Sequence, residues 1–263
     1  MRAPVKLRLQ ISGPLGHIEI DNIARRNAFD LDMWQALPEF IAALDENPDV
    51  RLIILRGKAD SPFCSGADIS EFATLRATAA GGLAYEEANE KAFAALANCS
   101  KPTLAAMRGF CMGGGMGLAA SCDLRVAEAG TLFAIPAARL SVGYPPQAMA
   151  MIVAALGVQS AMDLFATARR FDAAEARALG FLARIFSAEN FEIEVANMAS
   201  AIAANAPLTI KAAKAAIRRA ARLPGSATQK ACEDLAAACF DSADYVEGRE
   251  AFLAKRSPVF TGR

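Results

Sequence analysis

The sequence predicts an α/β fold. Up to Ser187, segments with the apolar pattern of β-strands alternate with segments in which apolar residues recur at helical spacing. From Ala188 onward the pattern is helical only. The chain has 263 residues, and 54% of them are hydrophobic. A chain of this length and composition can bury a stable core without disulfide bonds or structural metal ions. We therefore predict a core over residues 1–190 and a helical region over residues 191–263 that packs on the core or on another subunit.

The first elements along the chain are predicted to be a hairpin, a helix and a buried strand. The turn formers Ser12, Gly13 and Pro14 separate the two strands of the hairpin. Asp30 can cap the helix, whose apolar side chains recur at helical spacing and which ends before Pro48. The predicted strands cover residues 5–11, 17–20 and 51–56.

The middle of the chain continues the alternation. A polar, Ala-rich stretch that ends at Gly81 and Gly82 is predicted to be mobile, and a helix is predicted to follow it. The next strand runs into a glycine-rich turn and a helix of small residues. The predicted ranges are a helix over 83–98, a strand over 103–107, a short helix over 118–121, strands over 123–127 and 131–135, an apolar helix over 148–156, and C-terminal helices over 191–204, 207–222, 226–238 and 246–255.

Composition excludes several classes of function. The 28 basic residues balance the 28 acidic ones, and no basic run is present, so binding to nucleic acid or to an anionic membrane is not expected. The six cysteines form no C-x-x-C pair, as is typical of reduced thiols. The N-terminus lacks the apolar core of a signal peptide, and the longest apolar stretch is too short to span a bilayer. We expect a soluble cytoplasmic protein.

The single histidine limits the available chemistry. His17 lies in an alternating strand pattern, where a packed or solvated structural role is the expected one. Ser-His-Asp triads, Cys-His pairs and multi-His metal sites would all depend on this one residue. We therefore expect no metal site and look for catalysis by other groups.

Two glycine-bearing turns are the strongest functional signal. Each follows a strand and precedes a helix, one at Gly66 and the other at residues 113–115. Backbone N–H groups at a helix start are unpaired and attract anions. Two such turns that face each other can place one N–H each on a single oxygen and form an oxyanion hole. A dinucleotide loop is disfavoured because Leu118 occupies the place of its third glycine, whereas close packing of a small-residue helix stays open as a structural alternative.

Five segments, in order along nearly the whole chain, resemble the enoyl-CoA hydratase/isomerase (crotonase) superfamily. The resemblance implies a spiral of ββα units with a C-terminal helical trimerisation region, assembled as a homotrimer or a dimer of trimers. It also implies an acyl-CoA thioester ligand, whose coenzyme A is part of the substrate, so no separate cofactor is expected. The segments are residues 24–29, residues 63–69, residues 108–115 followed by Cys122 and Asp123, residues 133–136 and residues 255–263.

Position by position, the resemblance implies site residues. The N–H groups of Ala67 and Gly114 would form the oxyanion hole, in agreement with the two turns. Lys255 would reach coenzyme A from the C-terminal helix. For Arg26 and Lys255, an ordinary solvated surface charge is the alternative. The residues implied to line the coenzyme A path are Arg26, Ala28, Ser65, Gly66, Ala67, Asp68, Ile69, Gly114 and Lys255.

The chain departs from the family at the hydration chemistry. A hydratase of this family uses two glutamates, and their positions fall on Gly117 and Ala137. No Asp, Glu or His occurs from Lys91 to Cys122 or from Ala129 to Met162, so a general base would have to come from elsewhere in the fold.

Three functions stay open on the sequence. The first is an acyl-CoA lyase or isomerase that uses the oxyanion hole and a displaced acid or base. The second is a decarboxylase or hydrolase in which Tyr144 acts, since its segment is similar to that of family decarboxylases; a half-buried structural tyrosine is the alternative. The third is a non-catalytic acyl-CoA binding protein. The apolar helix over 148–156 is expected to form the floor of the acyl pocket or to be an ordinary part of the core.

Overall fold

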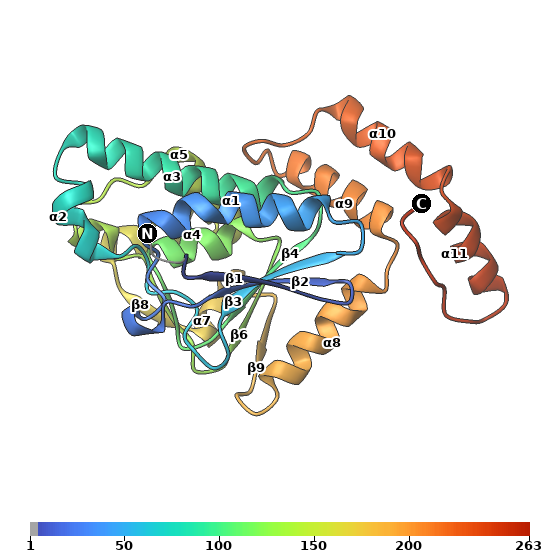
Figure 1. The fold of residues 1–263 in the computed structure, drawn as a ribbon, viewed down its shortest axis with the longest axis horizontal. Helices are drawn as coiled ribbons and strands as arrows, with labels where there is room; N and C mark the ends of the chain where they lie inside the picture. Colours follow the sequence, from blue (N-terminus) through green and yellow to red (C-terminus); the bar gives the residue numbers. More distant parts are fainter. Residues whose placement is uncertain (1–4) are drawn as a thin grey trace.

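A computed structural model describes residues 5–263, and its architecture confirms the predicted α/β class (Figure 1). A six-stranded sheet has the order β1-β2-β3-β4-β6-β9, in which β1 and β2 are antiparallel and the remaining neighbours are parallel. A smaller sheet has the order β5-β7-β8. The strands are β1 (Leu7–Ser12), β2 (Leu15–Ile20), β3 (Leu52–Gly57), β4 (Thr103–Met107), β5 (Phe110–Met112), β6 (Leu124–Glu128), β7 (Leu132–Ala134), β8 (Arg170–Asp172) and β9 (Arg184–Phe186).

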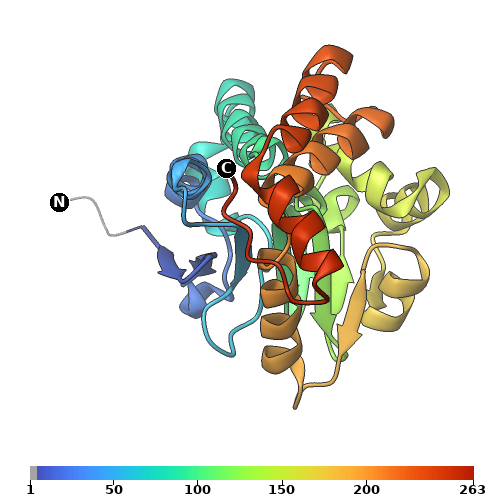
Figure 2. The same cartoon turned by 90° about the vertical axis from the view of Figure 1, so that its right-hand side faces the viewer.

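Helices cover both faces of the large sheet (Figures 1 and 2). The helices are α1 (Leu31–Glu46), α2 (Phe72–Leu75), α3 (Ala79–Asn98), α4 (Gly114–Ser121), α5 (Pro146–Leu156), α6 (Val158–Thr167), α7 (Ala173–Ala178), α8 (Phe191–Ala203), α9 (Pro207–Ala220), α10 (Gln229–Phe240) and α11 (Ala243–Leu253), with short 3₁₀ turns η1 (Ile23–Arg25), η2 (Ile69–Glu71) and η3 (Pro136–Arg139).

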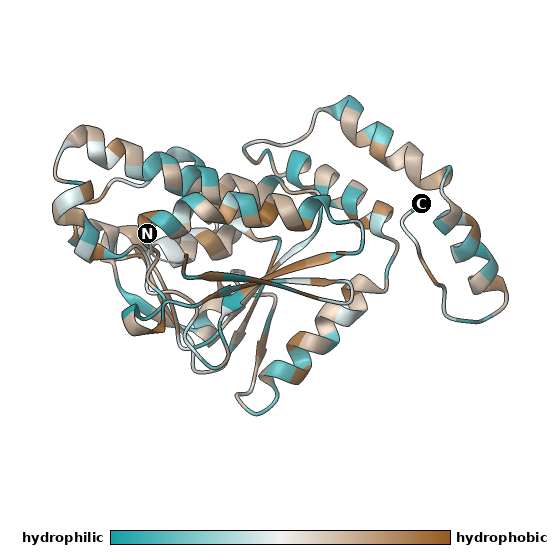
Figure 3. Cartoon of the chain, viewed as in Figure 1, coloured by the Kyte–Doolittle hydropathy of each residue, from teal (hydrophilic) through white to brown (hydrophobic). Residues whose placement is uncertain are grey.

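Alternate residues of the central strands supply two separate cores. Ile53 and Leu55 of β3 point into the larger core, which contains the buried faces of α1, α3, α4 and α5. Leu52 and Ile54 point the other way and pack on Phe191 of α8. This alternation follows from the period of two along a strand. It explains why β3 and β4, which are covered on both faces, are almost uniformly apolar (Figure 3).

Most predicted elements occur, with shifted ends. The hairpin, the strand over 103–107 and the Asp30 cap are confirmed, and Asp30 accepts a hydrogen bond from the Met33 N–H at 2.9 Å. The predicted start of the helix over 83–98 is wrong, because α3 begins at Ala79. Thr78 caps α3 through a bond from the Gly81 N–H, so Gly81 and Gly82 lie in the first turn of the helix.

The last two helices lie at one end of the molecule (Figure 1). The chain end folds back on α11, where Asp244 accepts hydrogen bonds from the N–H groups of Thr261 at 2.6 Å and Gly262 at 2.8 Å. Within residues 5–263, no single helix is long and apolar enough to cross a membrane, and one sharply bent pair, α5 with α6, passes that test by length and composition.

Candidate active site

The two glycine turns face each other. The Cys64 and Cys111 positions pair in a β-bridge, and the Met112 N–H donates to the Cys64 carbonyl at 2.9 Å. This pairing brings Gly66, with φ of +104°, against the start of α4. A β-carbon on Gly66 would lie 3.1 Å from the Met112 carbonyl oxygen and 3.5 Å from the Gly114 nitrogen. Only glycine fits this close approach.

The N–H groups of Ala67 and Gly114 are available to a ligand. A β-carbon on Gly114 would lie 3.6 Å from the Ala67 nitrogen, so the two groups are neighbours. Neither donates a hydrogen bond to a protein acceptor within residues 5–263. Gly114 is the first residue of α4, where an N–H has no partner inside the helix and the helix dipole is positive. The pair has the chemical character of an oxyanion hole.

A cavity of about 90 Å³, roughly the share of three water molecules in the liquid, lies over these two groups. It is found at the end of the molecule where α2 and the start of α3 lie (Figure 1). Its lining residues are Ser65, Gly66, Ala67, Ile69, Phe72, Arg76, Glu86, Asn89, Phe93, Gly113, Gly114, Pro136, Ala137, Leu140, Val142, Gly143, Tyr144 and Pro145.

Glu86 supplies the cavity with a carboxylate that the sequence reasoning missed. It forms an ion pair with Arg76 and accepts a hydrogen bond from Asn89 Nδ2 at 3.2 Å. Glu86, Asn89 and Phe93 are three and four residues apart on α3 and therefore share one face of the helix. In the sequence, the available signal is Asn89, a polar residue within an otherwise apolar stripe of this helix. The structure shows that Asn89 is only 7% exposed, and a buried polar side chain is the informative exception.

Phe93 fills the space beside Gly117, where the resemblance implies one of the two hydratase glutamates. A β-carbon on Gly117 would lie 2.6 Å from Phe93 Cζ, and Phe93 packs edge-on against Trp34 with ring centroids 5.5 Å apart. Ala137, at the other glutamate position, is buried and lines the cavity. The two family positions thus bring only apolar groups to this cavity.

Tyr144 lies beside the oxyanion hole. Its hydroxyl donates a hydrogen bond to the Gly113 carbonyl at 2.9 Å, and its ring packs edge-on against Phe165. Burial, and then the nearby Cys111 and Glu86, raise the pKa of the Tyr144 hydroxyl. The side chain is therefore a neutral hydrogen-bond donor that supports the turn before Gly114.

Most residues implied to bind coenzyme A lie together. The Phe29 N–H donates to the Gly66 carbonyl, and the Asp68 N–H donates to the Phe29 carbonyl, each at 2.8 Å. These bonds place Arg26, which is exposed, and Ala28, which is buried, beside the segment that holds Ser65, Ala67 and Ile69. Asp68 uses its carboxylate to cap η2 by accepting from the Ser70 N–H at 3.0 Å.

Lys255 lies elsewhere. It is exposed just beyond α11, and α11 lies at the opposite end of the molecule from α2 (Figure 1). His17 lies on β2, where burial and the neighbouring Arg56 lower its pKa, and it does not line the cavity. Residues 5–263 hold no group of three or more His, Cys, Asp or Glu side chains placed to bind a metal.

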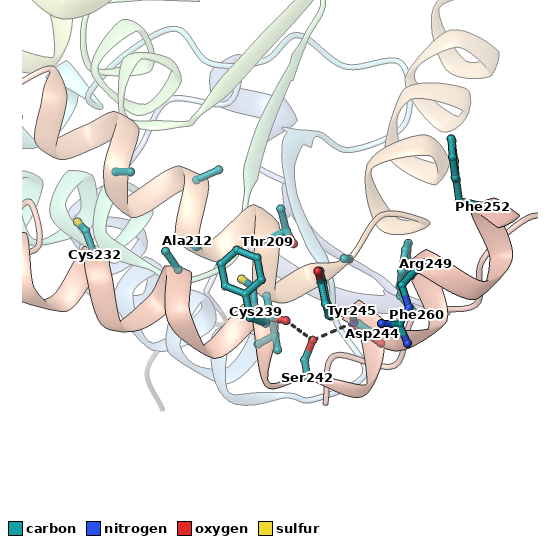
Figure 4. A pocket seen from close by; sticks show the side chains of 17 residues that line it. Thr209, Ala212, Cys232, Cys239, Ser242, Asp244, Tyr245, Arg249, Phe252 and Phe260 are labelled. Carbon is teal, nitrogen blue, oxygen red and sulfur yellow. Dashed lines mark hydrogen bonds between the residues drawn. The ribbon is translucent and has the colours of Figure 1, made fainter.

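A separate apolar groove of about 800 Å³ is formed by α9, α10, α11 and the chain end (Figure 4). Phe240 of α10 lines it, together with Tyr245 and Phe252 of α11. None of the residues predicted for the active site lines this groove.

A fold that places two adjacent, unpaired N–H groups in one cavity is typical of an enzyme. Comparison with known proteins gives the family. The family model described as enoyl-CoA hydratase/isomerase matches residues 10–263. The chain belongs to this family, as its sequence resemblance predicted.

Individual relatives agree. A Δ(3,5)-Δ(2,4)-dienoyl-CoA isomerase of Arabidopsis thaliana is 29% identical over 97% of this chain and 95% of its own. The crystal structure of an enoyl-CoA hydratase/carnitine racemase from Magnetospirillum magneticum is 34% identical, with a TM-score of 0.93 over 99% of this chain and 97% of its own. An enoyl-CoA hydratase/isomerase family protein from Hyphomonas neptunium is 36% identical, with a TM-score of 0.92 over 98% of each chain.

Proposed function

We propose that the protein binds an acyl-CoA thioester and stabilises its enolate between the N–H groups of Ala67 and Gly114, with Glu86 as the single acid–base group. The observation that carries this proposal is the combination of two unpaired, adjacent N–H groups with one carboxylate in the same cavity. Ser65 to Ile69, with Arg26 and Ala28, would line the path of the coenzyme A. The coenzyme enters as part of the substrate.

One carboxylate suits double-bond migration better than hydration. In the family, hydration uses two glutamates, and this cavity has apolar groups at both positions. For migration, Glu86 takes a proton from C2 of a 3-enoyl thioester, and the electron pair forms a dienolate whose oxygen lies in the oxyanion hole. The same carboxyl group returns the proton to C4, which gives the conjugated 2-enoyl thioester and restores Glu86. The Arabidopsis relative is named as an isomerase of this general kind.

The position of Tyr144 favours a supporting role in this reaction. Its hydroxyl proton is already donated to the Gly113 carbonyl, so it holds the turn that presents the Gly114 N–H. Decarboxylation or thioester hydrolysis with Tyr144 as the acting group, and acyl-CoA binding without turnover, are the alternatives that the assay separates.

We further propose that the C-terminal groove docks a second copy of the chain. Phe252 is 82% exposed and Phe240 is 66% exposed in this groove. Large apolar side chains exposed together on one surface mark an interaction site, whereas single exposed ones do not. Lys255 can contact coenzyme A only if another copy presents it, because within one chain it lies far from the cavity. The six cysteines are free thiols, which supports a reducing compartment such as the cytoplasm.

The test measures isomerisation of 3-hexenoyl-CoA, hydration of crotonyl-CoA, decarboxylation of methylmalonyl-CoA and release of free thiol from acyl-CoA. We expect isomerisation to dominate and Glu86→Gln to reduce it by about 100-fold or more, because the base is lost. The matched control is Glu87→Gln, the adjacent exposed residue of α3, which should keep full activity. Undiminished isomerisation by Glu86→Gln, or hydration as the main activity, would contradict the proposal.

A further inference from the structure

Arg76 is the one cationic side chain among the residues that line the acyl cavity. It follows α2, and its side chain is 14% exposed. The guanidinium carbon lies 4.4 Å from the centroid of the Phe72 ring and 5.1 Å from that of Tyr85. Stacking on two rings and the ion pair with Glu86 fix the orientation of this group.

Part of the guanidinium is not used by the protein. Nη2 donates to Glu86, whereas Nε and Nη1 donate to no protein acceptor within residues 5–263. Neither of these atoms is among the fully buried polar atoms that lack a partner. They therefore keep contact with solvent. Nε and Nη1 lie on opposite sides of the guanidinium, so either one can donate a charge-assisted hydrogen bond to a ligand carboxylate.

Glu86 keeps a second partner if the arginine engages a ligand. Asn89 Nδ2 donates to Glu86 Oε2, while Arg76 contacts Oε1. A ligand carboxylate can thus bind to the free side of Arg76 while Glu86 stays in place. A neutral acyl chain offers these donors no acceptor and leaves them to water, whereas a ligand carboxylate gains a charge-assisted hydrogen bond from them.

We infer that the acyl group carries a carboxylate, so that the substrate is a dicarboxylic acid bound to coenzyme A through one end. This inference rests on the proposed acyl-CoA binding and adds the substrate class. The carboxylate is retained in the reaction, because an ion pair to Arg76 stabilises the charged ground state and so opposes loss of CO₂.

The experiment compares binding of glutaryl-CoA and adipyl-CoA with binding of their distal methyl esters by titration calorimetry. The ester keeps the chain and removes the charge. For at least one chain length, we expect the acid to bind about tenfold or more tightly than its ester, as for other charge-assisted hydrogen bonds. Arg76→Gln should abolish that ratio, and Arg76→Lys should retain part of it.

The outcomes separate this inference from the proposal before it. If acids and esters bind equally to the wild type at both lengths, the inference is wrong and acyl-CoA binding stands. If a preference for the acid persists in a folded Arg76→Gln variant, Arg76 is not the subsite. If no CoA ester binds, both fail. The wild-type comparison needs no variant, so misfolding of Arg76→Gln cannot conceal the answer.

Discussion

At the scale of single residues, the space beside Gly117 is closed to any larger side chain. Phe93 fills the position into which a side chain at residue 117 would project. We expect Gly117→Ala to destabilise the protein by about 2 kcal/mol, because even one added carbon overpacks a filled core. Urea unfolding measures this, with Gly82→Ala as control, since nothing lies within 4 Å of a β-carbon there.

A double variant gives the sharper result. Phe93→Ala opens a cavity, and the added methyl at 117 then has room. The free-energy loss of Gly117→Ala/Phe93→Ala should be smaller than the sum of the two single losses by roughly 1 kcal/mol. Strict additivity would show that Phe93 is not what excludes a side chain from residue 117.

The buried thiols predict how stability depends on pH. Burial raises the pKa of Cys64 and of Cys122 to about 12, from the ordinary thiol value of 9.0. Above pH 9 these thiols ionise in the unfolded chain but not in the folded one, so rising pH favours unfolding. The free energy of unfolding should fall by up to about 1.4 kcal/mol per pH unit for each such thiol.

This dependence is measured by urea unfolding under reducing conditions at several pH values between about 8 and 10, around the ordinary thiol pKa. The wild type should lose stability over this interval, and Cys64→Ala/Cys122→Ala should lose less. Equal slopes for the two proteins would show that ionisation of these two thiols does not drive the loss.

Only some of the residues of the candidate site can be predicted from the sequence. Ala67 and Gly114 could be predicted because a glycine turn before a helix has a local signature. Glu86 and Arg76 could not, because they come from α3 and from the end of α2, and only the folded chain brings them over the turns. Glu86 also lies before Lys91, where the stretch without acidic residues around Gly117 begins.

At the scale of elements, a buried lysine of α9 forms an ion pair and a hydrogen bond with the core. Lys214 is 9% exposed, and its Nζ lies 2.8 Å from Asp123 Oδ2 and 2.8 Å from the Lys101 carbonyl. Asp123 also accepts hydrogen bonds from the Thr103 N–H and hydroxyl at the start of β4. The cluster thus joins α9, β4 and the end of α4.

We expect Lys214→Met to reduce the free energy of unfolding by about 3 kcal/mol, because Asp123 loses its ion-pair partner in a partly buried site. Chemical denaturation measures the change. Lys211→Met, at an exposed position of the same helix, should have little effect. Equal stability of the two variants would show that the ion pair does not hold α9.

Element boundaries reveal where local pattern is insufficient. Hydrophobic periodicity predicted the core strands and the helical C-terminus well. It missed β8 and β9, which have three residues each and exist because they pair with β7 and β6. The sequence predicts that α3 begins at residue 83, later than its observed start at Ala79, because Gly81 and Gly82 favour a turn. In the folded chain, the Thr78 cap and the packing of Tyr85 favour the helix.

At the scale of the whole molecule, the active-site cavity and the C-terminal groove lie at different ends. The proposed docking of a second copy predicts that Phe252→Asp shifts the protein to monomers in sedimentation velocity. A charge on the contact face would have to be desolvated on association. Leu83→Asp, which changes a similarly exposed residue of α3, should leave assembly unchanged. A wild-type monomer at micromolar concentration would contradict the proposal.

The most direct test of the central claim is exchange of the C2 protons of butyryl-CoA in D₂O, followed by proton NMR. This measurement needs the oxyanion hole and one base but no double bond. The wild type should catalyse exchange, and Glu86→Gln and Gly114→Pro should each slow it by about 100-fold or more, since one removes the base and the other the N–H. Glu87→Gln, at the adjacent exposed position of α3, serves as control. Exchange at the wild-type rate in either folded variant would contradict the account.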